Sequence, residues 1–382
     1  MPWLAWLRPP RRLLVLFLAV TLAPAAGLVW LGWRLLEQER ALEAQRRLER
    51  RQQGAELIVG ALREQLLASR QGLAEPSRAL EPGASDAVVV VLGDGPLQAH
   101  PASSLLYYPS TEPSHSATSA RGRQAFLRGE RHEFQEQDHA RAADVFRQLA
   151  KSEDRAVRAG AYLRLARNHR KAGHVDRALA AYDRLAELED VRLDGVPAGL
   201  VAGYARCSML ARLGREGDLR REAAKLHEEL LSGRWRLTRP VVELHLEQLS
   251  SWLGPLSGRE DGRRALSAAA EWLWEQWQEA RRGGPPVPDT ATHAAHGRMV
   301  TVLARADGEV LTALLAGPEY VRSRWVAGTS SVLGTHRLEL FLRDGSGHGV
   351  HGAAPPPGIP RTLRVAQDTG LPWTVMVTDA GP

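Results

Sequence analysis

The sequence predicts an α+β protein: a transmembrane helix that continues into a long stalk helix, then an all-α region, then a small α+β domain. Three observations predict this order. Residues 13–33 carry no charge, residues 121–283 show helical periodicity with an internal repeat, and residues 297–382 alternate short apolar runs with Gly-containing turns. Runs of helices followed by runs of strands are typical of α+β proteins.

The composition limits the classes of partner. The chain has 382 residues and a formal net charge of +6 that comes from arginine, with very few lysines, which suggests a GC-rich bacterial genome. The basic residues form no patch interleaved with aromatic residues, so we expect no nucleic-acid partner. Cys207 is the one cysteine. It can form no internal disulfide, and we expect a small buried residue of a helix.

The apolar stretch of residues 13–33 is long enough to cross a membrane. At about 1.5 Å per residue it forms roughly 30 Å of helix, which matches the hydrocarbon thickness of a bilayer. A cleaved signal peptide is the alternative, because residues 23–25 (Ala-Pro-Ala) offer a cleavage site. The apolar run continues past this site, and Trp30 and Trp33 lie where an aromatic belt would lie, so we favour a permanent anchor.

Arginines flank the apolar stretch on both sides. Arg8, Arg11 and Arg12 precede it, and a longer series follows from Arg34 onward. The positive-inside rule therefore does not favour an N-terminus inside the cell. Because the N-terminal tail of residues 1–12 is short, we expect a signal anchor in the bacterial inner membrane, with the bulk of the chain in the periplasm.

Residues 33–73 predict one long amphipathic helix. They are rich in Ala, Leu, Glu, Gln and Arg, and no proline occurs before Pro76. Apolar residues recur at spacings of three, four and seven, as on one helix face. Such a helix is either a mechanical stalk or a helix packed on the following domain. The apolar positions are Leu35, Leu42, Leu48, Ala55, Ile58, Leu62 and Leu66.

One strand and a loop follow the long helix. Residues 86–92 (DAVVVVL) form a β-branched apolar run that ends at Gly93-Asp94-Gly95, which predicts a buried strand and a turn. Residues 101–121 are rich in Ser, Pro and Thr, so we expect a loop there.

The helical region contains an internal repeat. Residues 139–154 (HARAADVFRQLAKSED) align with residues 175–190 (VDRALAAYDRLAELED) at an offset of 36, so that Phe146 matches Tyr182. A period of this length indicates a helical-hairpin solenoid. Residues 159–190 resemble a tetratricopeptide repeat, with Gly173 at the turn, although Leu185 and Asp190 depart from the pattern. The alternative is a generic helical bundle. The resemblance implies a protein- or peptide-binding surface, whose face the sequence does not identify.

Two further helices close this region. Both lie within residues 238–283, and the second begins after Gly258 and ends with Trp272, Trp274 and Trp277. These tryptophans either face a ligand or belong to the core or a domain interface, and we favour the core or interface. Residues 281–289 (RRGGPPVPD) break any helix and mark a domain boundary.

The last hundred residues predict five strands. Residues 299–305 and 309–315 form a hairpin around Ala306-Asp307-Gly308, and residues 318–326 form a short helix. Residues 337–342, 362–365 and 373–377 supply the other strands.

Three segments of this region carry a resemblance to Cache/PAS-like sensor domains. They are VTVLARADGEVLTALLAGPEY (residues 300–320), LFLRDGSG (340–347) and DTGLPWTVMV (368–377). Together with the order of the earlier elements, they resemble the N-terminal sensor (input) region of a bacterial membrane-bound sensor histidine kinase. The resemblance implies a homodimer and an unknown small-molecule ligand, and a second membrane span and a phosphoacceptor box in the gene beyond Pro382. The candidates for the ligand site are Tyr320, Arg322, Arg324 and Trp325; the alternative is that the two aromatic residues pack in the core and the two arginines are solvated.

Catalytic motifs do not occur in the sequence. Residues 131–134 (Arg-His-Glu-Phe) match a phosphoacceptor box only by chance, because Gln-Glu-Gln follows in place of Arg-Thr-Pro. His293 and His296, like His348 and His351, have ligand-like spacing but no nearby Cys or carboxylate cluster. We therefore expect no enzyme activity, no cofactor and no metal site.

Two hypotheses follow. The first is an extracytoplasmic sensory module of a two-component system, and the second is a membrane-anchored tetratricopeptide scaffold for protein–protein interactions in the bacterial envelope. The predicted divisions are a short tail (1–12), transmembrane helix (13–33), stalk helix (34–80), strand and loop (81–120), helical region (121–283), linker (284–296) and sensor domain (297–382).

Overall fold

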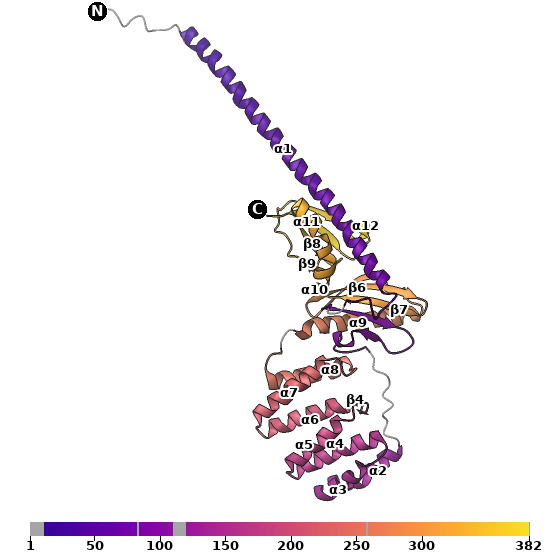
Figure 1. Ribbon diagram of the computed structural model, residues 1–382. Coiled ribbons are helices and arrows are strands. Elements are labelled where there is room, and N and C mark those ends of the chain that lie inside the picture. The colour runs from indigo at the N-terminus through magenta and orange to yellow at the C-terminus, as the bar shows by residue number, and fades with distance from the viewer. Residues whose placement is uncertain (1–10, 82–83, 110–119, 257–258, 382) are drawn as a thin grey trace, which may run out of the picture. The chain divides into compact units, whose positions relative to one another are not determined.

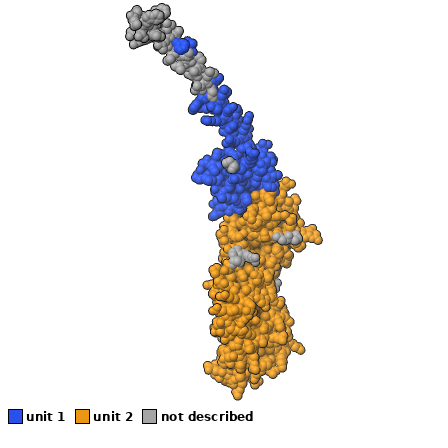
Figure 2. Space-filling view, turned by 60° about the vertical axis from the view of Figure 1, so that its left-hand side comes forward, with its two compact units in different colours: residues 1–63, 328–382 blue, residues 64–327 orange. Residues whose placement is uncertain are grey.

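The computed structural model describes residues 11–81, 84–109, 120–256 and 259–381 (Figure 1), with most side chains between residues 11 and 29 outside the described set. The chain forms two compact units (Figure 2). One holds residues 1–63 and 328–382, and the other holds residues 64–327. The predicted α+β class is confirmed, because a long N-terminal helix, a helical middle part and antiparallel sheets are present.

Helix α1 runs without a break from Arg11 to Gly72. Its second half is rich in good helix formers, which explains its length. The predicted stalk helix is therefore helical, but it ends at Gly72 and not near residue 80. In the part of the chain that the structure describes, no helix is long and apolar enough to cross a membrane. The predicted span of residues 13–33 falls largely on side chains outside that part, and it stays a prediction.

The first unit packs a sheet against α1. The antiparallel sheet has the order β10-β11-β8-β9. Ala55, Ile58 and Leu62 of α1 are fully buried, whereas Leu35 and Leu42, earlier on the helix, are about half exposed (54% and 53%). Of the two alternatives for this helix, packing on a domain is thus found for its second half. The elements of this sheet are β8 (Leu338–Arg343), β9 (Gly349–His351), β10 (Arg361–Arg364) and β11 (Thr374–Asp379), with short helices α11 (Ser330–His336) and α12 (Ala366–Thr369).

The second unit contains a five-stranded antiparallel sheet in the order β2-β1-β7-β6-β5. The predicted strand DAVVVVL becomes β1, and the predicted hairpin becomes β6 and β7. Helix α9 (Arg259–Arg281) packs on this sheet, and apolar residues of both form one core (Figure 1). The strands are β1 (Ala87–Leu92), β2 (Gln98–His100), β5 (Thr290–Ala295), β6 (Arg298–Asp307) and β7 (Val310–Ala316).

This sheet differs from the predicted division of the chain. Strand β1 pairs along its whole length with β7, so segments assigned to separate regions share one sheet. Residues 290–295, expected in a linker, form β5 because they complete the hairpin with β6. The strands of residues 297–382 are divided between two sheets and do not form one.

The helices between β2 and α9 extend away from the sheet of the second unit, and each packs against the next along the chain (Figure 1). Phe146 and Tyr182, which the repeat aligns, are both buried in one core. Gly173 (φ +78°) and Gly214 (φ +66°) turn the chain between helices, in a conformation that glycine adopts without strain. The helices are α2 (Ala120–Glu130), α3 (His139–Leu149), α4 (Arg155–Lys171), α5 (Val175–Ala186), α6 (Ala198–Arg212), α7 (Glu216–Leu231) and α8 (Arg239–Leu253).

Several short elements complete the fold. The strands β3 (Arg192–Leu193) and β4 (Val196–Pro197) pair between α5 and α6. A π-helical turn, η2 (Arg131–Gln135), continues α2. The predicted loop after Pro101 begins with a 3₁₀ turn, η1 (Ala102–Ser104), and its residues 110–119 lie outside the described residues. The predicted helix of residues 318–326 is α10 (Pro318–Tyr320) continued by the π-helical turn η3 (Val321–Val326) and the 3₁₀ turn η4 (Ala327–Thr329).

Candidate functional site

Two of the four residues predicted as a ligand site belong to the core. Tyr320 and Trp325 are 5% and 1% exposed, and their rings meet edge to face with centroids 5.5 Å apart. Burial raises the pKa of Tyr320. The indole Nε1 of Trp325 donates a hydrogen bond to the Ser69 hydroxyl at 2.9 Å. These aromatic rings therefore pack the short helix after β7 against the last turns of α1.

The other two predicted residues, Arg322 and Arg324, are exposed and paired. Arg322 forms an ion pair with Glu319, one turn earlier, and Arg324 with Glu81. None of the four is among the residues that line the pocket beside this helix, although the neighbouring Glu319 is.

A pocket of about 540 Å³ lies beside the same short helix, within the unit of residues 64–327. Its walls come from residues 84–86, from the η1 region, from the first turns of α9, from the start of β6 and from Glu319 of α10. The sequence did not point to these residues, because they come from five separate segments. The signal that could have found them is a charged residue at the start of a buried strand: Asp86 directly precedes β1, and Arg298 is the first residue of β6.

Asp86 holds three of these segments together. Its carbonyl oxygen accepts a hydrogen bond from the Gly317 N–H at 2.8 Å. Its Oδ2 accepts one from Arg298 Nη2 at 2.9 Å and another from the Glu319 N–H at 3.0 Å. The backbone of Asp86 has φ +59°, a left-handed conformation that Asp tolerates better than most residues. The start of β1, the start of β6 and the start of α10 thus meet at one carboxylate.

Two glycines leave room for this carboxylate. A β-carbon at Gly317 would overlap the Asp86 side chain, and one at Gly262 would lie 3.1 Å from Asp86 Oδ1. The approach at Gly317 therefore needs glycine, and at Gly262 a larger residue would require a small shift of the carboxylate.

Polar groups remain available in the pocket. Nη1 of Arg263 donates to the Leu231 carbonyl, which leaves its other N–H groups for a ligand. The buried Nε of Arg298 makes no hydrogen bond within the described residues. The hydroxyls of Ser103 and Ser104 also line the pocket. It therefore offers guanidinium donors, carboxylate acceptors and neutral hydroxyls, which suits a small polar ligand.

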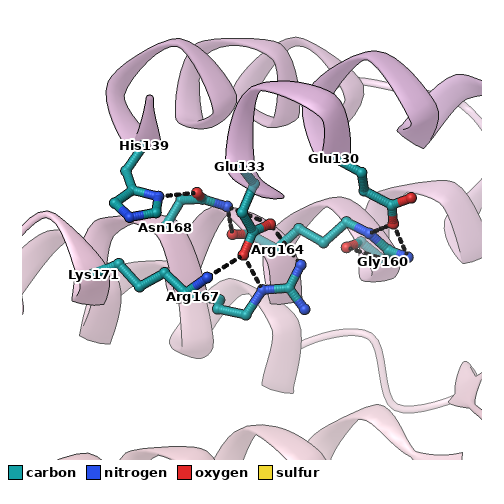
Figure 3. A network of polar contacts seen from close by, with 8 residues as sticks. All are labelled: Glu130, Glu133, His139, Gly160, Arg164, Arg167, Asn168 and Lys171. Atoms are coloured by element: carbon teal, nitrogen blue, oxygen red, sulfur yellow. Dashed lines mark hydrogen bonds and ion pairs between the residues drawn. The ribbon is translucent and has the colours of Figure 1, made fainter. Parts of the chain in front are cut away.

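A second polar cluster lies in the helical part, around Glu133 of the π-helical turn η2 (Figure 3). The side chain of Glu133 is fully buried and accepts hydrogen bonds from Arg167 Nε (2.7 Å), Lys171 Nζ (3.0 Å) and Asn168 Nδ2 (3.0 Å). Burial by itself raises the pKa of Glu133, but these three hydrogen bonds outweigh it and lower the pKa. The cluster joins η2 to α4 and is a structural tie, since its buried acceptor is already satisfied by α4.

His132 and Glu133, which match a phosphoacceptor box by chance, make contacts within the helical part. His132 lies 2.7 Å from Glu136 through Nδ1, one helical turn away. Glu133, the next residue, is the buried acceptor just described.

The tryptophans of α9 and Cys207 are also structural. Trp277 is 8% exposed in the core between α9 and the sheet, and Trp272 and Trp274 pack against that core, as favoured from the sequence. Trp272 stacks on His293 with ring centroids 5.3 Å apart. Cys207 is fully buried in α6, and burial raises its pKa to about 12, so it is an unreactive thiol.

No protein-family model matches the sequence, and comparisons with curated proteins and with solved structures also give no match. A function for this chain has to be argued from its own residues and their geometry.

Proposed function

We propose that the chain is the membrane-anchored extracytoplasmic sensory module of a bacterial two-component system, and that the pocket beside Asp86 and Arg298 receives its signal. The pocket is the observation that carries this proposal. Its volume of about 540 Å³ falls within the range of small-molecule sites, about 300–1,000 Å³. Its ion pair and remaining donors would orient a small polar ligand.

Contacts inside the second unit connect the pocket to the end of α1. Glu319 lines the pocket and lies in α10, which continues directly into η3. Trp325 of η3 is hydrogen-bonded to Ser69 near the end of α1. A ligand that binds Arg298 competes with Asp86, and Asp86 also holds the Glu319 N–H. Ligand binding would therefore favour one of two packings of this short helix against α1.

The membrane anchor is a further part of the proposal. Among the described side chains of α1, Phe17, Trp30 and Trp33 are 68%, 61% and 66% exposed. Exposed apolar side chains grouped along one element are typical of a membrane or partner contact. We propose that residues 13–33 span the bilayer, and that the sheet β2-β1-β7-β6-β5 with α9 is the Cache/PAS-like element.

A ligand screen tests the pocket. Small polar metabolites would be tested for their effect on the melting temperature of the full chain in a non-ionic detergent, and hits measured by calorimetry. A ligand at about one hundred times its Kd stabilises a protein by about 2.7 kcal/mol. We expect Arg298→Ala to weaken binding about tenfold or more, and Arg282→Ala, a change at an exposed arginine, to leave it unchanged. A ligand that binds the Arg298→Ala variant as tightly as the wild type would contradict the pocket assignment.

A second function, recruitment of a protein partner by tetratricopeptide-like helices, is favoured by grooves between those helices. One lies between α3 and α5 above α4, and another between α4 and α6 above α5. A photo-crosslinking amino acid at the exposed Ala180 would test it in the native cells. The scaffold predicts a discrete crosslinked protein from Ala180 and none from the exposed position 282.

A further inference from the structure

Helices α3, α4 and α5 enclose a groove of about 500 Å³ that has an apolar floor and a basic rim. Leu165 of α4 and Ala181 of α5 are buried at its base. Arg147 of α3 stands on one side, and Arg177 and Arg184 of α5 stand on the other, all exposed. Two walls of cations above an apolar strip give the groove both charge and hydrophobic contact area.

Few of the cationic donors are used. Arg147 pairs with Asp144, and Nη1 of Arg184 lies 3.2 Å from both carboxylate oxygens of Glu187. A guanidinium carries five N–H donors, so each arginine keeps several of them for a ligand. Among the residues that line the groove in the described structure, none is an Asp or a Glu.

The pKa of His169 responds to the charges around the groove. It is 6% exposed and contributes to the groove from α4. Burial lowers the pKa of His169, and the charges of Arg147 and Arg177 lower it further, together with His174; Asp144 acts in the opposite direction. The arginines around the groove therefore disfavour a positive charge on His169.

We propose that this groove binds an acidic segment of a partner protein. The proposal rests on the second function above, recruitment of a partner, and gives it a surface and a partner chemistry. Arg177 and Arg184 lie two helical turns apart on α5, which is about 10 Å at 1.5 Å per residue. A peptide in the polyproline II conformation covers about 9 Å in three residues, which is one full turn, so side chains three residues apart lie on the same side. The fitting segment carries carboxylates three residues apart, with an apolar side chain between them that packs on Leu165.

The probe is a synthetic peptide with Glu at every third position and Leu between, and its matched control has Gln in place of Glu. Binding to the full chain in a non-ionic detergent would be measured by fluorescence anisotropy. We expect the Glu peptide to bind and the Gln peptide to bind at least tenfold more weakly. Affinity should fall as salt is raised, because exposed charges are screened. The pKa of His169, followed by NMR, should rise when the Glu peptide is bound.

Matched variants locate the site. Arg177→Gln with Arg184→Gln should weaken the Glu peptide about tenfold. Arg170→Gln with Arg212→Gln, which removes the same charge from the groove between α4 and α6, should leave binding unchanged. Circular dichroism would check that both variants fold.

Three outcomes would overturn the proposal: no binding of the Glu peptide by the wild type, equal loss in both double variants, or displacement of the peptide by anionic phosphatidylglycerol vesicles, which would assign the groove to a lipid surface. Because the crosslinking from Ala180 can succeed while the peptide fails, loss of this inference and loss of the scaffold function are distinguishable.

Discussion

Glu133 is the residue on which the contact between η2 and α4 depends. Its carboxylate is fully buried, while its partners Arg167 and Lys171 keep 31% of their side chains exposed. A buried carboxylate is stable only when hydrogen bonds replace the water that it has lost. Removal of its charge leaves donors on α4 with a weaker acceptor.

We expect Glu133→Gln to destabilise the protein by about 1–3 kcal/mol, because charge-assisted hydrogen bonds are replaced by neutral ones in a buried place. Chemical denaturation of the full chain would measure the change. The control is Glu187→Gln, which removes an exposed ion pair with Arg184 and should cost about 0.5 kcal/mol or less. Equal effects of the two substitutions would show that the burial of Glu133 has no energetic consequence.

The same residue gives the protein an acid dependence. The pKa of Glu133 is lowered in the folded chain, so its carboxylate stabilises the fold fully above the unfolded pKa of about 4.3. This contribution is lost as the pH falls through the lowered folded pKa. The stability difference between wild type and Glu133→Gln should therefore narrow as the pH falls below about 4.3. A difference that stayed constant over that range would contradict the assigned pKa shift.

The partners of Asp86 could not be predicted from the sequence. The strand after it was predicted from its apolar run, and the run identifies Asp86 as a charged residue at the strand's start. Its partners Arg298 and Glu319 lie 212 and 233 residues further along the chain. Periodicity describes neighbours within one element, so it could not bring these segments together. The ligand was instead expected beside Tyr320, Arg322, Arg324 and Trp325, and for the two aromatic residues the alternative of core packing is the one found.

At the scale of elements, local signals were sufficient wherever one element determines its own conformation. The hairpin of β6 and β7, the helices on either side of Gly173 and the long α1 all follow from patterns within a few residues. Strand β5 was missed because its weakly apolar sequence becomes a strand only beside β6. Its conformation comes from pairing with a partner strand and not from propensity.

We expect substitution of glycine by alanine to have opposite effects on stability at Gly173 and at Gly60. Gly173 has φ +78° with open space at its β-carbon position, so Gly173→Ala should lower stability by about 1 kcal/mol through backbone strain alone. Gly60, inside α1, also has open space but a helical backbone. Gly60→Ala should raise stability by about 0.5–1 kcal/mol. Thermal unfolding of both variants would measure the two effects, and a loss at Gly60 would contradict its assigned environment.

At the scale of the whole molecule, the chain builds its five-stranded sheet from distant segments. The sheet of the second unit takes β1 and β2 from one part of the sequence and β5, β6 and β7 from another, with all the helices from α2 to α9 between them. The helical region is thus an insertion between two strands of one sheet. The domain boundaries predicted from the sequence lie where its composition changes. Strands that pair in this sheet lie on both sides of these boundaries.

This arrangement predicts how fragments behave. A fragment of residues 297–382, the domain expected from the sequence, lacks β1, β2, β5 and α9. Its strands β6 and β7 would expose the face that α9 buries and the edge of β7 that pairs with β1, and we expect no cooperative thermal transition by circular dichroism. A fragment of residues 64–327 keeps the whole sheet and its covering helix, so it should melt cooperatively. A cooperative transition in the shorter fragment, with dispersed NMR signals, would show that the pairing of β1 with β7 is not needed for the fold.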